Sequence, residues 1–355
     1  MRSRVTSSIL IVGFFLLADS CIEPFSFTPE EPVELLVVDG RIDQSSGPYE
    51  LRLSRTSAFG TPPDPVSDAQ VTIYDDLGQQ ERYFSVGPGI YQADGNVVRG
   101  EPGRTYYIEI QTEGDIYQSR PQTMPQLIQA DSAYSETEVE TFVSEQGNVT
   151  EEIFINVFVD TPAKQQNRDA YFRWLSDVSY SVIEADCGPL GRRTTCYITD
   201  TINTQNIALF SSENTETNQL NKFLVVTDDT RPQYAFSIRY YVNIYQLSIT
   251  QEAYQYWTDI KTIANQEGTI FDAPPAPISG NMYNIDDQSE TVLGFFEATA
   301  IDTVRDLLRR GDLAPLPISD FCGFAIGSQP SDPRACCNCL LIDKSTTERP
   351  DYWDE

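Results

Sequence analysis

Short runs in which hydrophobic and polar residues alternate recur through the first third of the chain. In Tyr49–Ser54, Gln70–Tyr74 and Thr105–Gln111, every second residue on one side of an extended chain is hydrophobic. Successive side chains of a strand point to opposite faces, so each run predicts a strand with one buried face. Clusters of Gly, Pro, Asp and Asn separate the runs as turns. About seven strands at this spacing predict an immunoglobulin-like or transthyretin-like β-sandwich over residues 33–127.

From residue 128 the pattern stays β-rich, but the loops become longer. The candidate strands are Ile153–Val159, Ala170–Trp174, Ser179–Glu184, Cys196–Thr199, Ile207–Phe210, Phe223–Val226, Tyr234–Thr250 and Thr291–Ala300. Residues 301–310 fit either a continued strand or a short helix capped by Asp302 and ended by Gly311. We therefore predict a second, larger β-rich domain over residues 128–355, and a mainly β fold for the whole chain.

One segment carries the periodicity of a helix. Ala253, Trp257, Ile260 and Ile263 recur at intervals of three and four residues and form one apolar stripe. Thr250 precedes them as a candidate N-cap. The pattern predicts a helix near residues 251–266, which we expect to cover a sheet.

The first twenty residues have the form of a secretory signal peptide. Two arginines, Arg2 and Arg4, precede the apolar run Ile9–Leu17. Nine helical residues span only about 14 Å, which is too short to cross a hydrocarbon core of roughly 30 Å. We therefore interpret residues 1–20 as a cleaved signal, not as a membrane-spanning helix.

The signal is followed directly by a cysteine. Leu17–Cys21 resembles a lipobox, in which the thiol receives a diacylglycerol and cleavage leaves the cysteine first, although Leu17 and Asp19 depart from the usual pattern. We predict lipid attachment at Cys21, with residues 21–32 as a polar tether. Two or three acyl chains anchor a protein durably. The alternative is an ordinary signal peptide followed by an incidental cysteine.

The net charge of the chain argues against one class of partner, nucleic acid. The chain has 53 acidic and 24 basic residues, for a formal net charge of −29. A surface of this sign repels phosphate backbones, so we do not expect nucleic acid as a partner. Hydrophobic residues make up 40% of the chain, which is enough to form ordinary buried cores.

The chain has no histidine, and this limits the chemistry it can perform. Ser-His-Asp and Cys-His catalysis and imidazole metal ligation all require that side chain. No phosphate-binding Gly-rich loop and no G-x-S-x-G elbow occurs. We predict no enzyme activity, catalytic residue, metal or cofactor. Hydrolysis by a pair of carboxyl groups stays open, because acidic residues are abundant.

The remaining cysteines favour disulfide bonds. With Cys21 reserved for lipid, six are left: Cys187, Cys196, Cys322, Cys336, Cys337 and Cys339. An even number suits an oxidising compartment outside the cytoplasm. We expect a local pair between Cys187 and Cys196, and a bond from Cys336 or Cys337 to Cys322 or Cys339. A zinc site made of the last four cysteines is the alternative.

Short sequences along nearly the whole chain carry a family resemblance. They are Cys21–Phe25, Leu36–Gly40, Gly47–Arg55, Pro102–Tyr106, Tyr171–Trp174, Glu252–Trp257, Gly280-Asn281, Leu293–Phe296, Cys337–Cys339 and Pro350–Trp353. With them the chain resembles a family of Bacteroidota lipoproteins, domain of unknown function 4249. The resemblance implies an outer-membrane lipoprotein whose gene often lies beside that of a TonB-dependent transporter. It implies no catalytic residues.

These observations lead to one expected function. We expect a lipoprotein anchored in the cell outer membrane that acts as a non-catalytic accessory or substrate-capture subunit, with a TonB-dependent transporter as its partner. Two alternatives stay open, namely a secreted carboxylate-dependent hydrolase and a structural or adhesion protein of the envelope. The ligand, the disulfide connectivity and the face of the membrane are left open.

Overall fold

The computed structural model describes most of the chain. The described residues are 34–58, 60–143, 147–165, 168–187, 193–202, 206–213, 215–265, 277–313, 318–323 and 329–353. The expected signal peptide, Cys21 and the tether lie outside these ranges. Within them, no helix combines the length and the apolar character that crossing a membrane requires.

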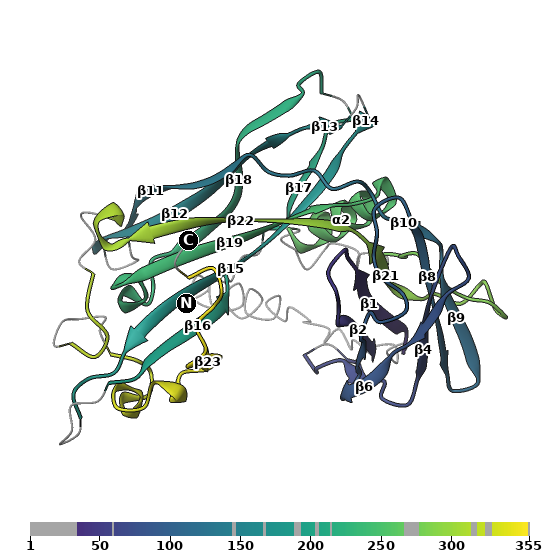
Figure 1. Ribbon diagram of the computed structural model, residues 1–355, viewed down its shortest axis with the longest axis horizontal. Helices are drawn as coiled ribbons and strands as arrows, with labels where there is room; N and C mark the ends of the chain where they lie inside the picture. The colour runs from purple at the N-terminus through teal and green to yellow at the C-terminus, as the bar shows by residue number, and fades with distance from the viewer. Residues whose placement is uncertain are drawn as a thin grey trace, which may run out of the picture.

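The first lobe is a sandwich of two six-stranded sheets (Figure 1). One sheet has the order β21 (Leu293–Ala298), β1 (Leu36–Ile42), β2 (Tyr49–Arg55), β7 (Ile90–Ala93) and β6 (Phe84–Gly87), with β3 (Asp64–Pro65) paired to β2. The other has the order β20 (Met282–Asn284), β9 (Asp115–Ser119), β8 (Thr105–Thr112), β4 (Gln70–Asp75) and β5 (Gln80–Arg82), with β10 (Gln122–Thr123) paired to β8. We call this body the sandwich lobe.

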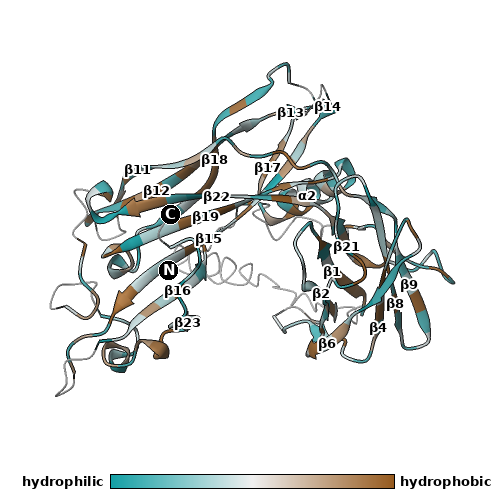
Figure 2. Ribbon diagram, viewed as in Figure 1, coloured by the Kyte–Doolittle hydropathy of each residue, from teal (hydrophilic) through white to brown (hydrophobic). Residues whose placement is uncertain are grey.

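The alternating runs form the strands that the sequence predicts. In β2, β4 and β8 the hydrophobic residues are buried at every second position, and their neighbours are more exposed. Both sheets contribute to a single core, which includes Leu51, Ile73, Ile108 and Phe296. The predicted sandwich is confirmed, and Figure 2 shows hydrophobic and hydrophilic residues alternating along its strands.

The sandwich lobe also contains strands from far along the chain. β21 pairs in parallel with β1, with Val37 opposite Leu293, and β20 pairs with β9. The expected division at residues 127 and 128 therefore needs correction, because residues 282–298 complete the first lobe. The alternating pattern could not reveal this, since pairing across 250 residues depends on which sheet edge is free.

The second lobe, which we call the large lobe, also has two layers. A three-stranded sheet is formed by β11 (Ser132–Val143), β12 (Val149–Pro162) and β18 (Gln219–Asp229). A six-stranded sheet has the order β22 (Ala300–Arg309), β19 (Arg239–Ser248), β15 (Tyr171–Ile183), β16 (Thr195–Thr201) and β23 (Ser345–Thr346), with β17 (Ala208–Ser211) paired to β15. β13 (Lys164–Gln165) and β14 (Arg168–Asp169) form a small ribbon.

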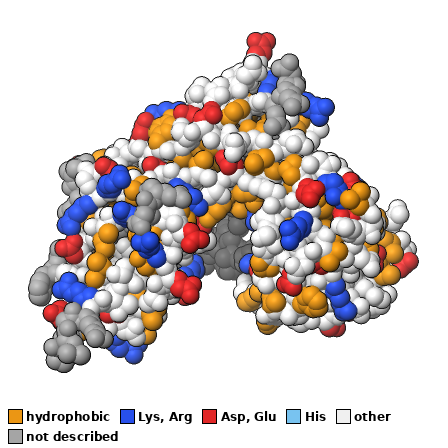
Figure 3. Space-filling model, viewed as in Figure 1, with side chains coloured by type: hydrophobic (Ala, Val, Ile, Leu, Met, Phe, Trp, Pro, Cys, Tyr) orange, Lys and Arg blue, Asp and Glu red, His pale blue; other side chains and the backbone are white. Residues whose placement is uncertain are grey.

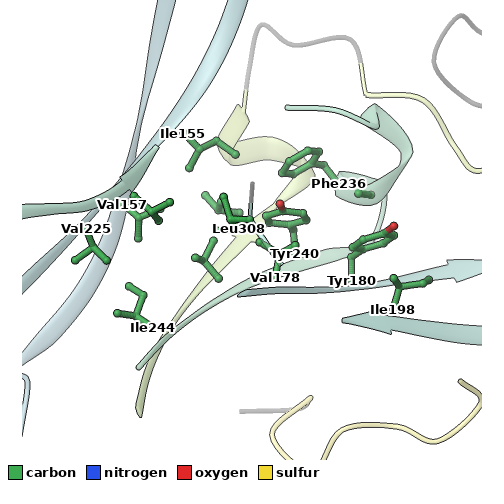
Figure 4. Close-up of a cluster of buried hydrophobic side chains, with 14 of the residues drawn as sticks. Ile155, Val157, Val178, Tyr180, Ile198, Val225, Phe236, Tyr240, Ile244 and Leu308 are labelled. Carbon is green, nitrogen blue, oxygen red and sulfur yellow. The ribbon is translucent and has the colours of Figure 1, made fainter. Parts of the chain in front are cut away.

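The core of the large lobe lies between these two sheets. Ile155 and Val157 on β12 meet Val178 on β15 and Ile244 on β19, as Figure 4 shows. On β15 and β19 the even-numbered side chains face this core. The odd-numbered side chains, such as Arg173 and those that follow it at every second position, therefore line the opposite face of the sheet.

Several strands differ in extent from the prediction. The two candidate strands at 170–174 and 179–184 are one strand, β15, because the polar residues between them pair with β19. The strand expected from Tyr234 begins at Arg239, because Gln233–Phe236 forms a 3-10 turn, η1, that buries two aromatic rings in the core. β11 was missed, since most of its residues are exposed and give no hydrophobic alternation.

The range left open at 301–310 is a strand. Ala300–Arg309 pairs along its length with β19 and then passes into a 3-10 turn, η2 (Arg310–Leu313). Only Thr299 separates β21 from β22, so the chain leaves a sheet of the sandwich lobe and enters a sheet of the large lobe at once (Figure 1). Gln44 of the sandwich lobe holds this crossing through hydrogen bonds to both backbone groups of Ile301.

The predicted helix is confirmed as α2, Gln251–Ala264. The Thr250 hydroxyl accepts a hydrogen bond from the Ala253 backbone nitrogen at 3.1 Å, which satisfies one of the free donors at the helix start. α2 lies where the two lobes meet, and Ala253 packs with Leu247 of the large lobe and Phe295 of the sandwich lobe. The helix therefore covers a sheet, as expected, and also joins the lobes.

Candidate functional site

A cleft lies between the two lobes, and Figure 3 shows the hollow from one side. Its larger part has a volume of about 510 Å³, within the range of roughly 300–1,000 Å³ that is usual for small-molecule sites. A second part of about 270 Å³ adjoins it and shares four lining residues with it: Arg41, Arg173, Leu175 and Trp257. We call the two parts together the inter-lobe cleft.

The larger part of the cleft has a mostly apolar wall. One part of it is the odd-numbered face of the large lobe's six-stranded sheet, where Leu247 on β19 lies opposite Ile301 on β22, and another part is Trp174 and Val225 at the margin of the lobe's core. Leu175 on β15 adds an aliphatic side chain that is 37% exposed. An aliphatic side chain left open inside a hollow is available to cover an apolar ligand.

One wall of the cleft holds a buried ion pair that joins the lobes. Arg173 on β15 donates from Nη2 to the carboxylate of Glu297 on β21, at 3.3 Å to Oε1 and 3.5 Å to Oε2. The indole nitrogen of Trp257 on α2 donates to Oε2 at 2.8 Å, and the Arg173 guanidinium lies 3.9 Å from the centre of the Trp257 ring. Three elements therefore meet at one carboxylate.

A polar network begins in the cleft, at Asp177 and Tyr245, and continues along the same sheet face. Asn243 on β19 donates to Asp177 at 2.6 Å and to Ser179 at 3.0 Å, and Tyr245 donates to the other oxygen of Asp177 at 2.8 Å. The C-terminal segment covers this network: the Tyr241 hydroxyl donates to the backbone oxygen of Trp353 at 2.7 Å. These contacts explain why the family-like tail holds a fixed position, and they indicate a structural role.

A third pocket, of about 430 Å³, adjoins the larger part of the cleft within the large lobe and shares Thr201 and Ile202 with it. It contains Asp200, Asp228 and Asp229. Burial raises the pKa of Asp228 to about 6, against the opposing effect of a hydrogen bond that Tyr240 donates to it at 2.5 Å. A carboxyl group with a raised pKa beside other carboxylates is the feature that a carboxylate-dependent hydrolase would need.

All six candidate cysteines form disulfide bonds in the structure. The pairs are Cys187–Cys337, Cys196–Cys339 and Cys322–Cys336. The expected bond from the adjacent cysteines to Cys322 is confirmed. The alternative zinc site is wrong, because each of its four sulfurs is bonded to another sulfur. Nor do the described residues hold any group of three or more side chains that could ligate a metal.

The expected local pair between Cys187 and Cys196 is wrong. The tail turns η3 (Pro333–Cys336) and η4 (Cys339–Leu341) lie against the hairpin of β15 and β16. Glu184 accepts a hydrogen bond from the Cys339 backbone nitrogen at 3.0 Å. This contact brings the tail cysteines within 6 Å, between Cα atoms, of their partners on the hairpin. Closeness in sequence therefore did not decide the pairing.

The residues of the cleft were not identified as a site from the sequence. Arg173 and Trp257 lie in family-like stretches, and Trp257 was assigned to the apolar stripe of the helix. An arginine in the middle of a hydrophobic strand was the one available signal, because such a charge needs a buried partner. The partner, Glu297, is 124 residues away. Cys21, the predicted lipid site, lies outside the described residues.

Comparisons with known proteins give a family but little else. No curated protein matches the chain. A solved structure titled "Biofilm associated protein - BSP domain" has 6% sequence identity and a TM-score of 0.13, so it carries no argument. That match covers 80% of this chain and 61% of the other. A family model described as Domain of unknown function (DUF4249) matches residues 22–305. Because the match covers well over half of the chain, this protein belongs to that family.

Proposed function

We propose that this protein is a lipoprotein of the outer membrane, anchored through Cys21, that captures a solute in the inter-lobe cleft for a TonB-dependent transporter. The observation that carries the proposal is the cleft itself. It has the volume of a small-molecule site, an apolar wall and a few charged groups, which is the usual composition of a binding pocket.

The way the lobes are joined supports binding without catalysis. The β21–β22 crossing, α2 and the Arg173–Glu297 pair hold the two walls of the cleft in one arrangement. A preformed site loses little conformational entropy when it binds its ligand. The charged groups that line the cleft are mostly paired with each other, and the chain has no histidine to move protons near neutral pH.

The proposals of a lipid anchor at Cys21 and of a transporter as partner rest on the sequence. The apolar run before Cys21 predicts export, and the family resemblance implies a neighbouring transporter gene. An accessory subunit tethered to the same membrane as its transporter would be held near it at a high effective concentration.

Purification of the tagged protein from solubilised membranes tests this function. We expect a TonB-dependent transporter to co-elute with the wild-type chain, and to be lost when Cys21→Ala removes the anchor. Metabolic labelling with palmitate provides the matched control, because it should label the wild type and not the variant. Repeated recovery of the labelled protein without a transporter would contradict the partnership.

A second candidate function is supported by one observation. The pocket around Asp228 holds a carboxyl group whose pKa is raised to about 6 by burial, as a carboxylate-dependent hydrolase would require. Chromogenic glycosides test this candidate, with Asp228→Asn as the control variant. Hydrolysis by the wild type that is lost in Asp228→Asn would favour the hydrolase over the proposed capture function. The third possibility, a structural or adhesion protein, would be favoured if the cleft binds no solute.

A further inference from the structure

The charged wall of the inter-lobe cleft contains a buried donor that the protein does not use. The side chain of Arg173 is only 9% exposed, and its Nε has no hydrogen-bond partner within the described residues. Its contacts with Glu297, at 3.3 and 3.5 Å, are long for a charge-assisted pair. A buried donor without an acceptor costs free energy, so an oxygen from a ligand would be stabilising there.

A second arginine faces the same space from the other lobe. Arg41 on β1 lines both parts of the cleft, and its side chain is 36% exposed. Its carboxylate partner, Asp43, is 3.8 Å away, which is beyond hydrogen-bond distance. Arg41 therefore keeps donors that can form a bidentate contact with a carboxylate.

Three of the four acidic groups of the cleft, by contrast, already accept hydrogen bonds, and only Asp39 accepts none among the described residues. Both oxygens of Asp177 accept hydrogen bonds, from Asn243 and Tyr245, and Glu297 accepts from Arg173 and Trp257. The remaining two acidic groups lie near Arg52. Glu50 accepts from Arg52 at 2.8 Å and from Gln92, and Asp39 is opposite Arg52 in the β1–β2 register. The unused capacity of the cleft therefore favours an anion over a cation, despite the acidic charge of the whole chain.

The rest of the cleft suits an apolar body. Leu175, Leu247 and Ile301 line the larger part, next to the two arginines. A ligand that placed its anionic group between Arg41 and Arg173 would cover these side chains with its remaining atoms, and burying that surface adds to its affinity.

From these contacts we infer that the cleft binds an amphipathic organic anion, with its carboxylate at Arg41 and Arg173 and its aliphatic part against Leu175. The biological meaning of this site rests on the proposed capture function, which it makes more specific. The binding chemistry rests only on the cleft.

Calorimetric titration of the full chain carrying Cys21→Ala tests the inference without detergent. The probes are decanoate and decanol, which have the same length and differ in charge. We expect decanoate to bind at least tenfold more tightly than decanol, because only the anion satisfies the arginine donors. Quenching of the fluorescence of Trp174 and Trp257, which both line the cleft, reports where the probes bind.

Variants separate the charged part of the site from the apolar part. Arg41→Gln should weaken decanoate about tenfold and leave decanol unchanged. Arg82→Gln, which removes the same charge from an exposed position on β5, should change neither. Leu175→Ser should weaken both probes about equally. Decanol binding as tightly as decanoate, an equal loss of both in Arg41→Gln, or no binding of either probe would each overturn the inference.

The outcome is independent of the test for the transporter. If the transporter co-purifies and decanoate does not bind, the inference fails and the proposed partnership stands. If decanoate binds through Arg41 and no transporter is recovered, the site stands and the partnership fails.

Discussion

Arg173 on β15 and Glu297 on β21 form an ion pair between the two lobes, with 3.3 Å between Nη2 and Oε1 and with both side chains at least 90% buried. The pair lies where the chain passes from one lobe to the other and where α2 packs against both. Trp257 contacts both members of the pair, through a hydrogen bond to the carboxylate and through its ring to the guanidinium. The cleft depends on this arrangement, because its walls belong to different lobes.

We predict that Glu297→Gln destabilises the protein by about 3 kcal/mol, because it leaves the buried charge of Arg173 uncompensated. Chemical denaturation of the purified variant measures the change. Replacing both residues by apolar ones, as Arg173→Met with Glu297→Leu, should recover most of the loss. Glu50→Gln is the matched control: it breaks an exposed pair with Arg52 and should cost at most about 1 kcal/mol. A similar loss in both single variants would contradict a structural role for the buried pair.

The close approach of β21 to β1 can be tested by comparing substitutions at two glycines. Gly294 on β21 has a φ of +92°, and a Cβ atom there would lie 1.9 Å from the backbone oxygen of Val38 on β1. We predict that Gly294→Ala costs about 3 kcal/mol or more, since both backbone strain and a clash with a neighbouring strand oppose it.

Gly78 is the control for this prediction. Its φ of +81° is similar, but nothing lies within 4 Å of a Cβ atom there. Gly78→Ala should therefore cost only the 1–2 kcal/mol or so of a left-handed residue. Thermal or urea denaturation compares the two variants. Equal losses would mean that β21 does not approach β1 as closely as the structure has it.

The disulfide pattern predicts the products of digestion. Proteolysis without reduction, followed by mass spectrometry, should yield peptides linked through Cys187–Cys337 and Cys196–Cys339. Reduction should release the tail from the β15–β16 hairpin and make it more susceptible to trypsin at Lys344, whose ammonium group is paired with Asp200 on β16. Recovery of a peptide linked through Cys187 and Cys196 would contradict the structure.

The raised pKa of Asp228 predicts how the free energy of unfolding depends on pH. Its folded-state pKa is raised from 3.8 to about 6 by burial, so between these values the folded state binds a proton that the unfolded state has lost. The stability from this group is therefore fully present below about pH 4 and is lost as the pH rises through 6.

Asp228→Asn tests this dependence and keeps an acceptor for Tyr240. We predict that the variant is more stable than wild type by on the order of 1–2 kcal/mol at pH 8, and no more stable at pH 4. Urea denaturation at both pH values measures the difference. Asp229→Asn removes the same charge at the next residue and serves as the control. A stabilisation that is the same at pH 4 and pH 8 would show that Asp228 is not the group that titrates.

The sequence alone was sufficient for features determined by neighbouring residues. The alternation in β2, β4 and β8 and the Thr250 cap of α2 depend on side chains within one strand or one helical turn, so their pattern can be read along the chain. The number of cysteines and their oxidised state also follow from sequence. The exposed strand β11 could not be found in this way, because it has no buried face along most of its length.

Only the tertiary structure decided which distant parts meet. The pairing of β21 with β1, the connection of Cys187 to Cys337 and the contact between Arg173 and Glu297 each join residues more than 100 positions apart. Many partners are compatible with any one of these residues, and the choice is made by the edges and faces left free once the sheets have formed. The cleft arises from the same choices, and for that physical reason its residues carry no local signal beyond the charge of Arg173 within a hydrophobic strand.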